Sequence, residues 1–270
     1  VVTTRDILDR MERAPNSSVR MAIPVVEPEH TPAVNHKIDP YIIGALLGDG
    51  CLINPTIRIS TDDPFVLSEI QRLYPSMDIR HISKYDYCLK DTNIVPGTKV
   101  SEMVVELRRL NLIGDRAWEE KIPQEYLGGS PEQRWALLQG LMDTDGSSDK
   151  GGSAEFSTSS EVMAHQIQEL IRGLGGICTM TERDTHYTYM GHTLVGRKSY
   201  RLRPRLAEPK KMFRLPRKKD RMPDSYKWKD DFRLYIKSVE YAGEEECQCI
   251  EVDHPEHLYV VDDYITTHNT

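Results

Sequence analysis

The pattern of apolar residues predicts two similar buried helices. Residues 41–48 and 135–142 are apolar at almost every position, which is typical of helices that are buried on all sides. Each stretch follows a residue that favours the helix N-cap and then a proline, which suits the first helical position. Each is also followed by a glycine, at which we expect a left-handed residue to close the helix. These boundary residues are Asp39, Pro40 and Gly50 for the first helix, and Ser130, Pro131 and Gly146 for the second, where Gln133 completes a capping box with Ser130.

The elements that follow these helices are repeated as well. Residues 57–61 and 154–158 have the pattern of matching strands, and residues 69–73 and 166–170 have the pattern of matching amphipathic helices. Two copies of one helix, strand and helix unit predict a domain with pseudo-two-fold symmetry.

The two apolar helices are expected to pack against each other. Small residues on both would let them approach closely, namely Gly44, Gly48, Gly140 and Thr144. This contact would leave Asp49 and Asp145 side by side at the C-terminal ends of the helices. Carboxylates at the negative end of a helix and near another acid are unfavourable unless a cation is bound. The pair is therefore a candidate Mg²⁺ site that could activate water against a phosphodiester.

Composition indicates an ordinary globular chain. Its 270 residues are enough for two domains, with 39% hydrophobic and 29% charged residues. The longest apolar stretches fall far short of the roughly 20 residues that cross a bilayer. Five cysteines without paired metal-ligand spacing favour a reducing, cytoplasmic location. Because the chain begins Val1-Val2 without methionine or a signal segment, we expect it to be a fragment of a longer protein.

Residues 197–229 form a basic stretch within a chain of net charge −7. Aromatic residues are interleaved with the lysines and arginines, a composition that is typical of nucleic-acid binding. A solvated basic face is the alternative interpretation. The residues that we expect to contact DNA are Arg197, Lys198, Arg201, Arg203, Arg205, Arg217 and Lys219.

The paired apolar helices, each ending in Asp-Gly, resemble the signature of LAGLIDADG homing endonucleases. The resemblance implies two αββαββα halves whose sheets contact double-stranded DNA along a long asymmetric target. It also implies that Asp49 and Asp145 are the catalytic acids that hold Mg²⁺, whereas Asp143 has a structural role. Each half of the family usually adds a basic residue near the reacting water.

For the basic residue of the first half we choose Lys121, by comparison with the family's Lys-x-Ile-Pro pattern. For the second half we choose Lys218, with Lys219 as its rival. The alternative for each lysine is contact with the DNA backbone without a part in catalysis.

The C-terminal residues carry a second pattern. Residues 249–253 and 257–261 have the alternation of strands, a turn is expected at Asp262-Asp263, and the chain closes with His268-Asn269-Thr270. An asparagine can cyclise onto its own carbonyl and break the next peptide bond. A neighbouring histidine can protonate the departing amine, and a hydroxyl can hold an acyl group as an ester. This order of features resembles the last two conserved blocks of inteins.

Cys249 points to one class of intein. Most inteins carry aspartate at this place, whereas class 3 inteins carry cysteine there and threonine as the first downstream residue, which Thr270 matches. The resemblance implies that Cys249 attacks the upstream junction and that Thr270 then takes over the acyl group. A buried structural cysteine, or redox pairing with Cys247, is the alternative.

The remaining steps of splicing follow from the same resemblance. Asn269 would cyclise with assistance from His268 and His257, and Asp253 is assigned to the same site. No cofactor is expected for splicing. The upstream splicing blocks, including the tryptophan that class 3 inteins use, would lie before Val1, so this chain should not splice alone.

The expected fold class is α+β. An all-β, Hint-like horseshoe would be formed by both termini, with the pseudo-symmetric endonuclease inserted in it. The expected domains are residues 1–35, 36–231 (halves 36–128 and 129–231) and 232–270. Within the first, Thr3 or Thr4 would cap a short helix through Arg13, and residues 24–32 would form a connector.

The expected partners are DNA, the missing N-terminal intein segment and a host protein. A threonine at the downstream junction suits insertion into a P-loop ATPase such as a replicative helicase, and no membrane partner is expected. Two other interpretations stay open. The chain could be a free-standing LAGLIDADG homing endonuclease whose final tripeptide is accidental, or a DNA-binding protein that has lost cleavage.

Overall fold

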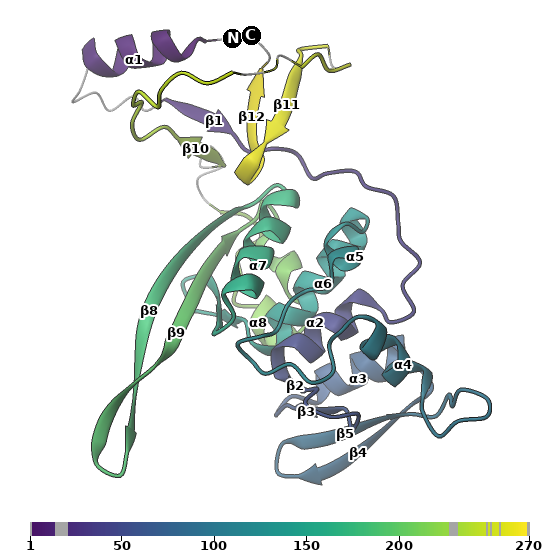
Figure 1. Cartoon of the computed structure of the whole chain (residues 1–270). Helices are drawn as coiled ribbons and strands as arrows, with labels where there is room; N and C mark the ends of the chain where they lie inside the picture. The colour runs from purple at the N-terminus through teal and green to yellow at the C-terminus, as the bar shows by residue number, and fades with distance from the viewer. Residues whose placement is uncertain are drawn as a thin grey trace.

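The computed structural model describes residues 2–13, 21–226, 232–246, 248, 250–253 and 255–268. Within them the chain is a mixed α+β structure in which one order of elements occurs twice (Figure 1). The first run contains α2 (Pro40–Asp49), β2 (Gly50–Cys51), β3 (Arg58–Ser60), α3 (Pro64–Leu73), β4 (Met77–Ser83), β5 (Asp86–Asp91), α4 (Glu102–Arg109) and α5 (Gln124–Leu127). The second contains α6 (Pro131–Thr144), β6 (Ser147–Ser148), β7 (Ala154–Thr158), α7 (Glu161–Gly173), β8 (Ile177–Tyr189), β9 (His192–Arg205), the 3₁₀ helix η1 (Pro209–Met212) and α8 (Pro216–Lys219). The predicted repeat of helix, strand and helix is confirmed.

Each run forms one antiparallel four-stranded sheet. The strand orders are β2-β3-β5-β4 and β6-β7-β9-β8, so the two sheets have the same topology. In the second sheet, Phe156 of β7 pairs with Leu202 of β9, and both side chains are buried on the side that α7 covers. Because side chains alternate along a strand, the residues next to them lie on the opposite, uncovered face.

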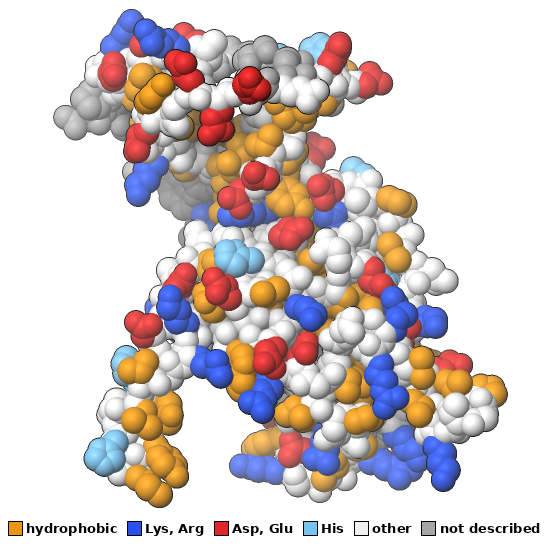
Figure 2. All heavy atoms as spheres, viewed as in Figure 1, with side chains coloured by type: hydrophobic (Ala, Val, Ile, Leu, Met, Phe, Trp, Pro, Cys, Tyr) orange, Lys and Arg blue, Asp and Glu red, His pale blue; other side chains and the backbone are white. Residues whose placement is uncertain are grey.

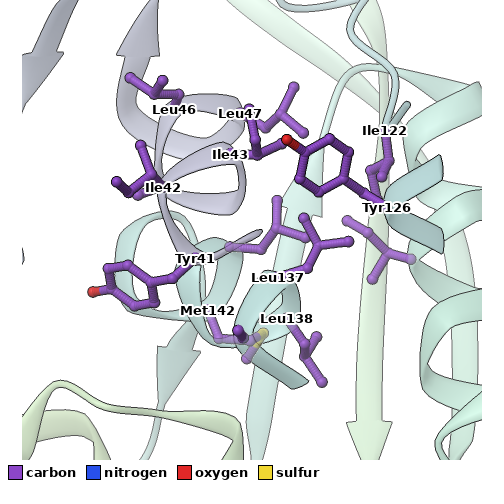
Figure 3. Packing of buried hydrophobic residues seen from close by; sticks show 14 of the residues in the cluster. Tyr41, Ile42, Ile43, Leu46, Leu47, Ile122, Tyr126, Leu137, Leu138 and Met142 are labelled. Atoms are coloured by element: carbon purple, nitrogen blue, oxygen red, sulfur yellow. The ribbon is translucent and has the colours of Figure 1, made fainter. Parts of the chain in front are cut away.

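The helices α2 and α6 pack against each other at the centre of the molecule, and both sheets flank them (Figure 1). Their apolar side chains belong to one core cluster with Ile122 and Tyr126 (Figure 3). A Cβ atom on Gly44 would lie 2.2 Å from the carbonyl oxygen of Leu137, and one on Gly140 would lie 2.1 Å from that of Tyr41. Only glycine fits at either place, so the predicted close contact of the helices is confirmed.

The starts of these two helices are as predicted, but their ends are not. Asp39 accepts a hydrogen bond from the amide of Tyr41, and Ser130 and Gln133 form the capping box. Gly50 has φ −81°, and Gly146 also has no left-handed backbone, so the prediction of a left-handed closing residue is wrong. The glycines are needed for a different reason: a Cβ on Gly50 would lie 2.1 Å from the Leu46 carbonyl oxygen, and one on Gly146 would lie 2.5 Å from that of Met142.

The terminal segments pair with each other. The chain starts with α1 (Thr4–Arg13), where Thr3 and Asp6 exchange hydrogen bonds as expected of a cap, and with β1 (Ala22–Pro24). β1 pairs with β10 (Arg233–Tyr235), and β11 (Leu258–Val261) pairs with β12 (Ile265–His268) through the 3₁₀ turn η3 (Asp262–Tyr264). A long connector without helix or strand leads from β1 to α2. The predicted helix, connector and turn are confirmed.

One predicted strand is not formed. Residues 250–253 lie outside any strand, and the Ile250 side chain is 43% exposed. An alternating sequence becomes a strand only where a neighbouring strand offers backbone partners. Within the described residues, no strand pairs with this segment.

Candidate functional site

Two carboxylates meet at the C-terminal ends of the central helices. Asp49 is the last residue of α2, and Asp145 is the C-cap of α6. A Cβ atom on Gly48 would lie 2.0 Å from the Thr144 hydroxyl oxygen and 3.3 Å from the Asp145 amide nitrogen, so the two helix ends are in contact. The expected meeting of Asp49 and Asp145 is therefore present in the fold.

The environment of the pair disfavours two negative charges. Desolvation by surrounding atoms raises the pKa of Asp49 above its usual value. Asp145 keeps an exposed side, but desolvation and then the neighbouring charge of Asp49 raise its pKa to about 7. Both acids therefore carry an electrostatic penalty that a cation between them would relieve.

Lys218 interacts electrostatically with both acids and is 5% exposed. Its ammonium donates to four backbone carbonyls, those of Met142 (3.0 Å), Asp143 (2.7 Å), Thr144 (2.8 Å) and Gly146 (2.5 Å). Burial lowers the pKa of Lys218 to about 8, although the charges of Asp49 and Asp145 oppose that shift. Lys218 thus satisfies the carbonyls at the end of α6 and fixes the turn that carries Asp145. Its rival, Lys219, is exposed.

Asp143, to which the resemblance assigns a structural role, is held by hydrogen bonds from three groups. It is 2% exposed and accepts a hydrogen bond from the Tyr41 hydroxyl at 2.9 Å. It also accepts the backbone amides of Arg214 (3.1 Å) and Leu215 (3.0 Å). Asp143 therefore joins α2, α6 and the segment that leads to Lys218.

Glu120 is a residue near the site that the sequence analysis missed. Desolvation, then the charges of Asp145 and Asp115, raise the pKa of Glu120 to about 8. The adjacent Lys121 is exposed. Counting back from Ile122, the Lys-x-Ile-Pro spacing falls on Glu120 rather than on Lys121. Close reading of that spacing could have identified Glu120, whereas its interaction with Asp145 depends on the fold.

The basic residues expected to contact DNA lie mainly on β9. Tyr200 and Leu202 are buried, so Arg201 and Arg203 lie on the opposite, uncovered face of the sheet, where both pair with Glu155 (2.9 and 3.4 Å). Arg203 is exposed, whereas Arg201 and Glu155 are half-buried. Ion pairs at the surface contribute at most about 1 kcal/mol, so Arg203 can exchange the carboxylate for a phosphate at little cost.

The other members of the predicted set have different neighbours. Lys198 pairs with Glu182 (2.7 Å) and Arg217 with Asp63 (2.7 Å), while Arg197 stacks on Trp118 (3.7 Å) and Arg205 on Tyr226 (5.3 Å). Figure 2 shows further Lys and Arg side chains along the lower edge of the molecule, over the sheet that contains β4 and β5. The far end of the β8–β9 hairpin is instead apolar, with Tyr189 and Met190 exposed.

The C-terminal site is only partly covered by the described residues. Cys247, Cys249, Asn269 and Thr270 lie outside them. His257 precedes β11 and His268 ends β12, and their rings are 6.1 Å apart in an edge-on arrangement. Asp253 is exposed in a bend. The fold thus brings together the two histidines that were assigned to the asparagine step.

Comparison with known families identifies the second half of the repeat. Residues 132–203, which include α6, β7, α7 and most of the β8–β9 hairpin, match the LAGLIDADG-like domain family. The chain contains a LAGLIDADG-like domain. The element order of residues 40–127 repeats that of the matched half.

The chain is also similar to a replicative DNA helicase DnaB of Mycobacterium intracellulare. The two are 31% identical over 240 residues, or 86% of this chain. The chain spans about a third, 35%, of the length of that relative.

The LAGLIDADG-like domain has solved neighbours of low similarity. A mesophilic variant of the homing endonuclease I-DmoI is 13% identical, with a TM-score of 0.40 over 64% of this chain and 91% of that one. Two further I-DmoI structures hold target DNA, one with manganese and one with magnesium. They are 13% and 15% identical over 64% of this chain and 89% and 91% of theirs, with TM-scores of 0.40 and 0.39.

The pair Asp49 and Asp145 fits a hard divalent cation in its donor chemistry. Within the part of the chain that the structure describes, no group of three or more His, Cys, Asp or Glu is placed to hold a metal. Mg²⁺ is usually held by one or two carboxylates together with waters and substrate phosphates. Asp49 and Asp145 therefore suit an ion that is shared with a bound phosphodiester. None of the described helices combines the length and apolar character needed to cross a bilayer.

Proposed function

We propose that the chain is part of an intein that carries a homing endonuclease. The LAGLIDADG-like domain would cut both strands of a specific DNA site with Mg²⁺, and the paired terminal segments would catalyse protein splicing. The observation that carries the nuclease is the meeting of Asp49 and Asp145 at two helix ends. Desolvation raises the pKa of both carboxyls, and the charge of Asp49 raises that of Asp145 further. The similarity to a DnaB helicase supports a replicative helicase as the host protein.

The residues of the LAGLIDADG-like domain divide the work of DNA cleavage. Asp49 and Asp145 would hold Mg²⁺, which when bound supplies a polarised water and neutralises phosphate charge. Lys218 would keep the Asp145 turn rigid through its four carbonyl contacts. The uncovered sheet faces, with Arg201 and Arg203 on β9, would track the DNA backbone and base edges.

The terminal segments would form the splicing module. Domain bounds near residues 1–35, 36–231 and 232–270 are supported by the pairing of β1 with β10 across the whole central domain. The thiolate of Cys249 would form a thioester with the upstream segment and release the amine of the intein's first residue. The Thr270 hydroxyl would then accept the acyl group and return the thiol.

Release of the C-terminal segment is the last chemical step. The side-chain nitrogen of Asn269 would attack its own carbonyl carbon, forming a succinimide and expelling the amine of Thr270, which His268 protonates. His257, whose ring is edge-on to that of His268, supports this assignment. An acyl shift from the Thr270 oxygen to its nitrogen would leave a normal peptide bond.

The nuclease is tested with a helicase gene that lacks the insertion. The chain should linearise a plasmid bearing that site with Mg²⁺ and fail to do so with EDTA. Asp145→Asn should keep DNA binding and lose at least about 100-fold in cleavage rate. Asp220→Asn, an exposed acid at the end of α8, is the matched control and should cut normally. Binding without cleavage by the unaltered chain would instead favour a DNA-binding protein.

Splicing is tested separately, with a reporter domain fused after Thr270 and a candidate upstream intein segment mixed in. Ligation, or a thioester at Cys249, cannot arise from a free-standing nuclease. Asn269→Ala should block release of the reporter and leave the branched ester. Unchanged release in this variant would refute the assignment of Asn269.

A further inference from the structure

The turn between β11 and β12 contacts α7 of the LAGLIDADG-like domain and the connector that leads to α2. The Tyr264 hydroxyl donates to Glu29 Oε2 at 3.5 Å, and Asp263 forms an ion pair with Arg172 of α7. Tyr264 directly precedes β12, the strand that ends at His268. The turn therefore links the endonuclease fold to the proposed splice junction through only a few residues.

Arg134 holds together the two segments that the turn contacts, the connector at Glu29 and the end of α7 at Gly173. It lies in the first turn of α6, its side chain is 2% exposed, and it donates to the carbonyl oxygens of Glu29 and of Gly173, the latter at 3.1 Å. Its guanidinium also pairs with the Glu29 carboxylate at 3.4 Å. The Glu29 amide donates to the same Gly173 carbonyl at 3.1 Å. One buried arginine thus ties the helix that carries Asp145 to the end of α7 and to the connector.

Gly173 leaves the space that Tyr264 occupies. A Cβ atom there would lie 2.9 Å from the Tyr264 hydroxyl oxygen, 3.2 Å from its Cζ and 2.8 Å from Arg134 Nη1. The backbone of Gly173 is helical and does not itself need glycine. Close approach is therefore the reason for this glycine, and Glu29, Arg134 and Gly173 together form a seat for Tyr264.

The seated turn has an unfavourable backbone. Asp263 and Tyr264 have φ of 61° and 60°, in the left-handed region that costs a bulky residue of order 1 kcal/mol or more. A turn of this kind persists only when its surroundings hold it. The antiparallel register that follows sets Val261 opposite Ile265 and Leu258 opposite His268. Relaxation of the turn would shift that register and move His268 relative to His257.

We propose that Glu29, Arg134 and Gly173 are positioning residues for the C-terminal cleavage step, acting through Tyr264. This inference rests on the proposed splicing function. It makes the folded endonuclease domain a structural requirement for the geometry of the splice junction, apart from any DNA cleavage. The seat acts on the rate of asparagine cyclisation by holding β12, and none of its residues touches the reacting atoms.

The experiment uses the full chain with the reporter after Thr270. Gly173→Ala, which adds one methyl group into the seat, should slow reporter release by about tenfold, and Tyr264→Phe should slow it by about threefold. The double variant should release no more slowly than Gly173→Ala alone, because both changes break the same contact. Hydrogen exchange should accelerate in β11 and β12. Gly128→Ala, with its nearest atom at 3.8 Å, and Tyr74→Phe, which removes a 3.2 Å hydrogen bond to Asp91, are the matched controls.

The outcomes separate the two proposals. If the unaltered chain releases no reporter, with or without the upstream segment, the splicing function fails. If it does release reporter and Gly173→Ala releases it equally fast, the seat has no positioning role. Faster exchange in β11 and β12 with unchanged release would also overturn the inference, since the seat would then be packing alone. DNA cleavage should be unchanged in all seat variants, which excludes global unfolding as the cause.

Discussion

Replacing Gly44 with alanine would insert a methyl group between the two central helices. The new Cβ would lie 2.2 Å from the Leu137 carbonyl oxygen and 2.8 Å from the Leu141 amide nitrogen. Since ordinary contact begins near 3.4 Å, α2 and α6 must separate by about 1 Å. Overpacking of this kind costs about 3 kcal/mol, offset by about 1 kcal/mol from the better helix propensity of alanine. The net loss of unfolding free energy should be about 2 kcal/mol.

The same displacement acts on the acid pair, because Asp49 and Asp145 are carried on these two helices. A misplacement of catalytic groups by about 1 Å lowers rates by about 100-fold. Single-turnover cleavage of the target DNA should therefore slow by that factor, while DNA binding, which we propose for the sheet faces, should change little. Stability is measured by urea unfolding of the same preparation. Gly128→Ala, where the added atom meets nothing closer than 3.8 Å, should alter neither quantity.

Normal cleavage and an unchanged urea midpoint for Gly44→Ala would refute the helix contact itself. A lower midpoint with normal cleavage would show that the contact exists but that it does not set the spacing of the two acids.

Three further changes test the site and its supports. The pKa of about 7 for Asp145 in the folded chain lies above the unfolded value of about 3.9, so the wild-type chain should lose stability relative to Asp145→Asn as pH rises from 4 to 7. After allowance for solvent screening we expect a loss of about 1 kcal/mol in unfolding free energy, measured from urea midpoints across that range. Parallel curves for the two proteins would contradict this prediction. Lys218→Met should lower the unfolding free energy by about 3 kcal/mol because it leaves four carbonyls without their donor. The control Lys219→Met should change the unfolding free energy by no more than about 0.5 kcal/mol. Equal urea midpoints for the two variants would disprove the capping role of Lys218. Ser130→Ala removes the acceptor of the Gln133 amide and should cost about 1 kcal/mol by the same assay, with no effect counting against the capping box.

Features that depend on neighbouring residues were predictable from the sequence. The capping box at Ser130 involves side chains three positions apart, and the buried character of α2 and α6 follows from continuous apolar stretches. The repeat added a long-range prediction, because two units of the same pattern imply one interface between them. For this reason the contact at Gly44 and Gly140 could be predicted before the fold was known.

Features that depend on distant segments not related by the repeat were not predictable. Lys218 meets the end of α6 across more than 70 positions, and nothing in its local sequence separates a carbonyl-capping lysine from one that contacts DNA. Desolvation, and then the charge of Asp145, raise the pKa of Glu120, and both depend on what the fold brings near that side chain. Local alternation at residues 250–253 suggested a strand, yet a strand requires a partner that the segment itself does not specify. The role of Gly173 could not be predicted either, because the side chain that needs the space at this glycine is Tyr264, near the other end of the chain.

The pairing of β1 with β10 has a consequence for the history and engineering of this chain. Pro24 lies opposite Arg233, and the Val25 amide donates to the Phe232 carbonyl oxygen at 3.4 Å, so the ladder continues up to the point where the two strands diverge. For that small sheet, everything between Val25 and Phe232 is one hairpin loop. Loop entropy grows only slowly with length, so the sheet itself would tolerate loss of the entire loop and its replacement by a short turn. The segment between Val25 and Phe232 could therefore be inserted or removed as a whole, provided that the chain without it held the turn at Tyr264 by other contacts.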